Sequence, residues 1–147
     1  SPQTGELAHQ TDDMLLMGDK DKVETNNNSN TATNYFAAVR LSRQEARDSA
    51  VSLLQEAMAY GSQEQVEQSN AQLEEIIQYA LCEAQIESLV IAKGYKDCVA
   101  YVTETGISVA VAAPEGGLKE ADVAVVADVV LSQSAFTLND IRVIEVP

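Results

Sequence analysis

The chain has 147 residues and a formal net charge of −14, with 9 Lys and Arg against 23 Asp and Glu. A nucleic-acid-binding protein needs a concentrated basic surface to displace counterions from phosphates, so this excess of acids argues against that function and against direct binding to anionic membranes. Hydrophobic residues make up 46% of the chain, which is ordinary for a globular protein. The length suits one compact domain and an additional helix.

Residues 1–30 are predicted to be a disordered linker. The segment is polar, carries charges of both signs and ends in the run Asn26-Asn-Asn-Ser-Asn30. Its one apolar patch, Met14-Leu-Leu-Met17, is interpreted as incidental, with a nascent helical turn or a weak docking peptide as the alternatives. The chain has no run of about 18 apolar residues, so we predict no transmembrane segment within it. Because it starts without an initiator Met, we expect any membrane anchor to lie upstream.

A first helix is predicted over residues 31–61. Thr31 or Thr33 is expected to cap its N-terminus, and Gly61 ends it. Apolar residues recur along this segment at helical spacing, which indicates that one side of the helix is buried. These residues are Tyr35, Phe36, Val39, Ala46, Ala50, Leu53, Leu54, Ala57 and Met58.

Three arginines form a cationic stripe on this helix. Arg40, Arg43 and Arg47 follow one another at spacings of three and four and therefore share a face. One interpretation is a solvated face paired with Glu45 and Asp48. The other is a contact surface for an acidic partner or a neighbouring subunit, which makes these three arginines the predicted partner-binding residues. Because exposed helix charges contribute little stability, we expect charge reversal at Arg43 and Arg47 to leave the fold intact.

Residues 62–147 are predicted to form an α+β domain. The domain opens with a long helix that runs to about Lys93. Ser62 and Gln65 fit a capping box at its start, and Gly94 suits a left-handed stop at its end. The first half of this helix is polar, so we expect it to project from the domain.

Two short β-segments, a third helix and a last strand follow. The strands are predicted at about residues 98–103, 107–113 and 141–146. In this α-β-β-α-β order, a right-handed crossover through the third helix places the last strand in the same sheet. The predicted fold is a two-layer α+β domain with a three-stranded sheet, preceded by the N-terminal helix. The third helix, over about residues 119–134, has an apolar stripe made of Val123, Val126, Ala127, Val130 and Leu131.

The sequence shows no catalytic, cofactor-binding or metal-binding constellation. His9 is its one histidine, which argues against a Ser-His or Cys-His pair and against a metal site. Residues 115–119 follow a proline and are interpreted as a turn rather than a phosphate-binding loop. Cys82 and Cys98 are interpreted as small buried hydrophobic residues, with a disulfide as the alternative. We predict that the protein is not an enzyme and uses no cofactor.

Two segments carry a resemblance to a known family. One is Asn34-Tyr-Phe-Ala-Ala-Val-Arg-Leu-Ser-Arg-Gln-Glu-Ala-Arg47, and the other is Ile86-Glu-Ser-Leu-Val-Ile-Ala-Lys-Gly-Tyr-Lys-Asp97, which leads into a β-hairpin. With the long acidic helix between them, these segments resemble the stage III sporulation protein AH family of endospore-forming Firmicutes. The resemblance covers about residues 33–146.

This resemblance implies a ring-building-motif fold, similar to that of secretion-system and flagellar basal-body ring proteins, behind an extra N-terminal helix. It also implies a single-pass mother-cell membrane protein whose extracytoplasmic domain lies between the two membranes around the forespore. That domain would bind stage II sporulation protein Q of the forespore and assemble into a channel-like ring. The N-terminal tail and the two cysteines match no feature of the family pattern.

The preferred hypothesis is a structural interaction domain, a sporulation channel subunit that binds itself and a partner. The alternative is a small-ligand-binding or sensory α+β module of a membrane-tethered protein, which a bound metabolite in a polar pocket would favour. Ring assembly requires heterologous contacts, through the sheet edge, the third helix or the first two helices. We expect the first two helices, with their arginine stripe, to contact the partner.

Overall fold

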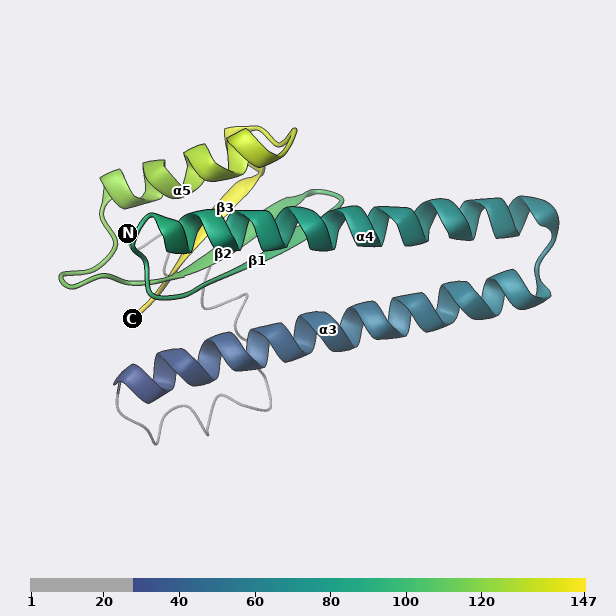
Figure 1. The fold of residues 1–147 in the computed structure, drawn as a ribbon, viewed down its shortest axis with the longest axis horizontal. Coiled ribbons are helices and arrows are strands. Elements are labelled where there is room, and N and C mark those ends of the chain that lie inside the picture. Colours follow the sequence, from purple (N-terminus) through teal and green to yellow (C-terminus); the bar gives the residue numbers. More distant parts are fainter. Residues whose placement is uncertain (1–27) are drawn as a thin grey trace.

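The computed structural model describes residues 28–147, and its first two helices lie side by side in an antiparallel hairpin (Figure 1). Helix α3 spans Asn28–Tyr60 and helix α4 spans Gln63–Ala92. Because α3 begins before the expected Thr31 and Thr33 caps, both threonines lie inside the helix and this predicted start is wrong. Apart from residues 28–30, which begin α3, the predicted linker with its apolar patch and histidine lies outside the described residues.

Both ends of α4 follow the predicted signals. The Gln65 N–H donates to Ser62 Oγ at 3.3 Å, and the Ser62 N–H donates to Gln65 Oε1 at 2.8 Å. This reciprocal pair satisfies N–H groups that the first turn of a helix leaves without a partner. After the helix, Gly94 has a φ of 109°, a conformation in which a Cβ would be strained. The capping box and the glycine stop are therefore confirmed.

Three strands form one sheet in the order β1-β2-β3. Strand β1 (Cys98–Thr103) pairs antiparallel with β2 (Gly106–Ala112), which pairs parallel with β3 (Ile141–Val146). Helix α5 (Glu120–Gln133) and the short 3-10 helix η1 (Leu138–Asp140) connect β2 to β3. The α+β class, the α-β-β-α-β order, the three-stranded sheet and the preceding helix are confirmed.

Helices α4 and α5 cover one face of the sheet and form the predicted two-layer unit with it. In α5, the predicted stripe is buried at Val126, Ala127 and Val130, but Leu131 is 37% exposed and Val129 is buried instead. Side chains alternate between the two faces of a strand, so every second strand residue contributes to this core. The buried strand residues on this face are Cys98, Ala100, Val102, Ile107, Val109, Val111 and Val143.

Helix α3 covers part of the opposite face, which adds a layer that the sequence did not predict (Figure 1). Tyr35, Phe36 and Val39 in its first half are buried against the sheet. Full burial of a side chain such as Phe36 contributes about 2 kcal/mol. The strand residues on this face are Val99, Ala110, Ile144 and Val146. The sheet is thus held between helices on both sides.

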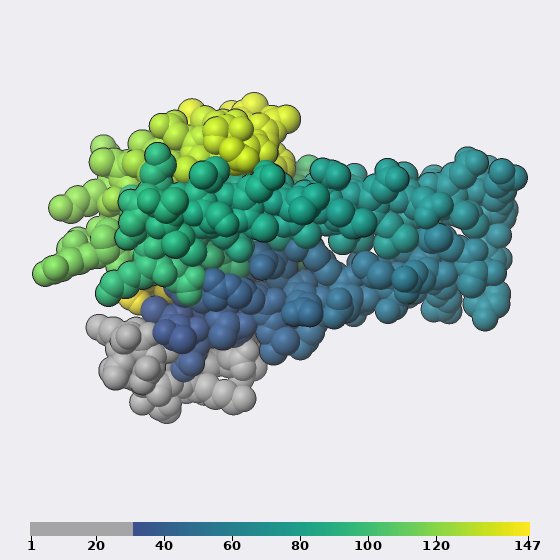
Figure 2. All heavy atoms as spheres, viewed as in Figure 1, coloured from purple at the N-terminus to yellow at the C-terminus, as the bar shows by residue number. Residues whose placement is uncertain are grey.

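Beyond the sheet, α3 and α4 continue together as a two-helix projection (Figure 2). Leu54 and Leu73 are only half-buried there, and Ser69 is buried where the helices approach closely. At the tip, a Cβ on Gly61 would lie 2.5 Å from the Ala57 carbonyl oxygen, so the turn requires glycine. The expected projection of the first half of α4 is confirmed, and α3 projects with it.

Candidate interaction surfaces at the two sheet edges

Carboxylates of α4 occupy the outer edge of β1. An edge strand leaves the N–H and C=O groups of alternate residues without a strand partner. Here the Ala100 N–H donates to Glu87 Oε2 at 2.8 Å, and the Val102 N–H donates to Glu83 Oε2 at 2.7 Å. The two glutamates therefore accept the bonds that the backbone of a neighbouring strand would accept.

Arginines of α3 complete the same edge. Arg43 Nη1 donates to the Ala100 carbonyl at 2.6 Å and to Glu87 Oε2 at 2.7 Å. Arg47 donates to both carboxylate oxygens of Glu83, and Arg43 lies 3.3 Å from Glu83 Oε1. Each glutamate thus binds a backbone N–H and a guanidinium at once, a charge-assisted arrangement that is stronger than a neutral hydrogen bond.

A third, more exposed pair closes the start of β1. The Asp97 carboxylate accepts from the Cys98 N–H at 2.8 Å and from Arg40, which also donates to the Cys98 carbonyl at 3.3 Å. The Arg40 and Asp97 side chains are 40% and 32% exposed, so water screens this pair. We name the whole set the edge ladder, which consists of Arg40, Arg43, Arg47, Glu83, Glu87 and Asp97.

Glu83 is the buried centre of the edge ladder. Its side chain is 1% exposed, and those of Arg43 and Arg47 are 18% exposed. The hydrogen bond to Glu83 raises the pKa of the Arg47 guanidinium. A carboxylate removed from water is tolerated only when its oxygens are well paired, and two arginines and one backbone N–H pair them here. The edge ladder therefore ties α3 to α4 and to β1.

The three predicted arginines share a face, as expected, but that face points toward α4 and β1. The interpretation as a solvated face paired with Glu45 and Asp48 is wrong, because the partners of the arginines belong to the edge ladder. Contact with a partner protein stays a prediction for all three. Arg40, as the most exposed of them, is the best placed for it.

The sequence analysis missed the acidic members of the edge ladder. The signal available was a matched spacing: Glu83 and Glu87 are four apart on one helix, as Arg43 and Arg47 are on the other. Residues four apart lie on the same side of a helix, so two such pairs face each other in an antiparallel hairpin. Nothing in the sequence indicated that the edge of a strand lies between them.

The outer edge of β3 has no neighbouring strand within residues 28–147. The Val146 carbonyl accepts from the Ala113 N–H at 2.8 Å on the β2 side. Because backbone groups alternate in direction along a strand, those of Ile141, Val143 and Glu145 point away from β2. The Ile141 N–H donates to a carbonyl of η1. The sheet offers no acceptor for the N–H groups of Val143 and Glu145.

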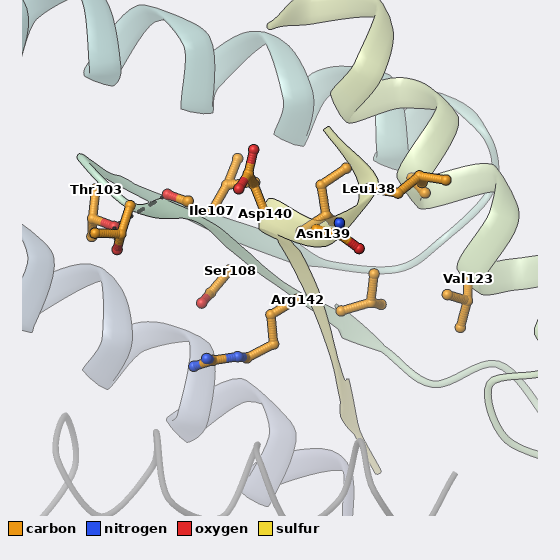
Figure 3. Close-up of a pocket in the computed structure, with 13 residues that line it drawn as sticks. Thr103, Ile107, Ser108, Val123, Leu138, Asn139, Asp140 and Arg142 are labelled. Atoms are coloured by element: carbon orange, nitrogen blue, oxygen red, sulfur yellow. Dashed lines mark hydrogen bonds between the residues drawn. The ribbon is translucent and has the colours of Figure 1, made fainter. Parts of the chain in front are cut away.

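A groove of about 570 Å³ lies beside the start of β3 (Figure 3). Val123 and Leu138 line it on the side of α5, and Leu138 is 65% exposed. Ser108 and Arg142 line it on the side that faces α3 (Figure 3). The groove therefore combines an apolar wall, polar side chains and the free edge of a strand.

The two cysteines are free thiols. Burial, together with the nearby carboxylates of Glu87 and Asp97, raises the pKa of Cys98 to about 12. Burial also raises the pKa of Cys82. A thiol becomes a nucleophile or a metal ligand by losing its proton, so neither is activated at neutral pH. Within residues 28–147, no three His, Cys, Asp or Glu side chains are placed to hold a metal ion.

Tyr95 joins the corner between α4 and β1 to the start of α5. Its hydroxyl donates to Asp122 Oδ1 at 2.5 Å, and the Lys119 N–H donates to Asp122 Oδ2 at 2.8 Å. Burial and this hydrogen bond raise the pKa of Tyr95 to about 12, and the same bond lowers the pKa of Asp122. Tyr95, which follows the glycine stop at Gly94, therefore has a structural role.

A small sheet with one sealed and one open edge, extended by a helical hairpin, presents surfaces that suit contact with another protein. No helix in the described part of the chain has the length and apolarity needed to cross a membrane. The profile of the SpoIIIAH-like protein family matches residues 2–143, and the chain therefore belongs to this family of sporulation proteins. The family membership predicted from the sequence is confirmed.

A solved structure supports the same fold. A chain in the structure of the SpoIIQ-SpoIIIAH pore forming complex superposes on this one with a TM-score of 0.66 and 16% sequence identity. The match covers 76% of this chain and 96% of that chain. At such low identity the likeness shows the shared fold alone. None of the curated proteins matches this chain.

Proposed function

We propose that this chain is a non-enzymatic component of a sporulation channel that binds a forespore protein similar to stage II sporulation protein Q. Membership of the SpoIIIAH-like family carries this proposal. The fold shared with a chain of a complex described as pore forming supports it. We extend the pore-forming role named for that complex to the present chain.

The proposed location is the space between the mother-cell and forespore membranes. In this proposal the described domain is extracytoplasmic and is held by a membrane anchor upstream of Ser1. The segment before α3 would then separate the folded part from the mother-cell membrane. A net charge of −14 keeps such a domain away from anionic lipid surfaces and favours a partner with basic groups.

We further propose self-association into a ring. Ring closure needs a heterologous contact, in which one surface of a subunit meets a different surface of the next. The helical hairpin offers exposed apolar side chains for this contact, among them Leu53 on α3 and Ile77 and Leu81 on α4. The predicted partner contact through Arg40, Arg43 and Arg47 is retained, with Arg40 as the accessible member.

Light scattering of the domain, alone and mixed with the extracytoplasmic domain of the forespore partner from the same organism, tests the proposal. We expect a defined heteromeric complex, and a complex with more than one copy of each chain would support ring assembly. If the domain stays monomeric and does not bind the partner at high concentration, the proposal is contradicted. The groove beside β3 would then be screened for small ligands, as the sensory alternative requires.

A further inference from the structure

We propose that the outer edge of β3 binds an extended segment of a different protein, which adds a fourth strand to the sheet. This inference deepens the proposed function and rests on it, because it names a second surface for the partner, in addition to the proposed contact at Arg40. The observation that carries it is the contrast between the two edges of the sheet. The edge ladder occupies the outer edge of β1, whereas no strand lies beside β3 in the described chain.

The backbone of β3 supplies the hydrogen bonds for an added strand. The N–H groups of Val143 and Glu145 point away from β2 and find no acceptor in the sheet. The carbonyls of Ile141, Val143 and Glu145 point the same way, because N–H and C=O of one residue face the same side of a strand. Recognition by strand addition uses such a row of main-chain groups for affinity.

The groove beside β3 supplies the side-chain contacts. Successive side chains of an added strand would point alternately to the two faces of the sheet. On the α5 face they would meet Val123 and Leu138, and on the α3 face they would meet Arg142 and Ser108. Leu138 is 65% exposed and is the one exposed large apolar side chain among the described residues that line the groove.

The occupant is a different protein rather than a second copy of this chain. A second copy cannot offer its β1 edge, because the edge ladder already satisfies that edge. Pairing β3 with β3 of another copy gains no charge complementarity, since Arg142 and Glu145 lie on opposite faces of the sheet and no antiparallel register sets them opposite each other. The net charge of −14 favours an extended segment with basic residues as the occupant.

Amide hydrogen exchange, measured by NMR on the domain with and without the partner domain, tests this inference. In the free domain, the amides of Val143 and Glu145 should exchange rapidly although both side chains are at least partly buried. The amides of Ala100 and Val102 should already be slow, because Glu87 and Glu83 accept from them. Addition of the partner should slow exchange at Val143 and Glu145 at least tenfold and leave β1 unchanged.

The outcomes separate this inference from the proposed function. A complex detected by light scattering with unchanged exchange at Val143 and Glu145 overturns strand addition and leaves the proposed function standing. No complex overturns both. Protection that rises with the concentration of the domain alone overturns the assignment to a different protein and identifies a second copy as the occupant.

A matched pair of variants adds an independent readout. Leu138→Glu places a charge in the groove and should weaken partner binding at least tenfold in a calorimetric titration. Ile91→Glu is the control, because Ile91 is 45% exposed near the C-terminal end of α4 and lines neither the groove nor the helical projection. Both variants should keep the native circular dichroism spectrum. Equal affinity of the two variants would overturn the inference.

Discussion

The two edges of this three-stranded sheet differ in the partners of their outward backbone N–H and C=O groups. At β1, carboxylates and guanidiniums of two helices take the hydrogen bonds that another strand would take. At β3, the outward N–H groups of Val143 and Glu145 have no strand partner in the described chain. Two helices can therefore close a sheet edge with charged side chains alone. Such a closure depends on a few residues, so single substitutions can test it.

The position of the helical hairpin explains the difference. Helices α3 and α4 lie on opposite faces of the sheet next to β1, so their side chains meet around the outer edge of that strand. Helix α5 packs on one face only and reaches β3 from one side. An edge at which side chains of two helices bind the outward backbone groups is protected from pairing with strands of other chains, whereas an edge without such side chains stays available.

Glu83→Ala is expected to have the largest effect on the sealed edge. The substitution removes the shared acceptor of Arg43, Arg47 and the Val102 N–H. Removing one partner of a buried ion pair typically costs about 3–5 kcal/mol. Urea unfolding at neutral pH measures the loss. Glu74→Ala, at an exposed position of the same helix, is the control and should cost less than about 0.5 kcal/mol.

The same geometry revises the expectation for Arg43 and Arg47. Charge reversal at these positions would set new carboxylates against Glu83 and Glu87. We now expect such variants to lose stability, so a loss of partner binding in them would not locate the interface.

If Glu83→Ala were as stable as the Glu74→Ala control, the edge ladder would be no more than a set of surface contacts.

Gly106→Ala tests the start of the open edge. A Cβ at this position would lie 2.4 Å from the Asp140 carbonyl oxygen, where β2 and the approach to β3 come together. We expect a loss of about 1–3 kcal/mol from overpacking, measured as a lower urea midpoint with an unchanged denaturant slope. Thr105→Ala, at an exposed position in the adjacent turn, is the control. Equal stability of the two variants would contradict the close approach.

Glu87→Gln separates charge from hydrogen bonding at the sealed edge. The amide oxygen can still accept from the Ala100 N–H, but the charge that binds Arg43 is lost. We expect a loss of about 1 kcal/mol. Hydrogen exchange should speed up at Ala100 and stay slow at Val102, which has its own acceptor in Glu83. Faster exchange at both amides would indicate that the edge opens as one unit.

The smallest effect concerns the pH dependence of stability at Cys98. Its pKa is raised to about 12 in the folded state by burial, so the folded thiol keeps its proton where the unfolded thiol has lost it. The contribution is complete below the unfolded pKa of about 8.5 and is lost as the pH rises through the folded value. Between pH 8 and 9 we expect the wild type to lose about 0.7 kcal/mol more than Cys98→Ala. Parallel pH curves in urea unfolding would refute this.

Local signals in the sequence predicted most of the secondary structure. The run from Cys98 is rich in β-forming residues, and β1 has the predicted bounds, as does β3. The helix start at Ser62 and the glycine stop at Gly94 were predictable because each depends on bonds within a few residues. The start of α3 was not predicted, because neither threonine acts as its cap.

The sequence by itself determined that three arginines share a face of a helix, that a polar half-helix projects, and that a three-stranded sheet carries two helices on one face. Helical period relates residues of one helix to each other but contains no information on what that helix faces. Only the tertiary structure placed α3 on the opposite face of the sheet and set Arg43 and Arg47 against Glu83 and Glu87. The tertiary structure alone therefore decided that the arginine stripe seals one edge of the sheet and leaves the edge of β3 open.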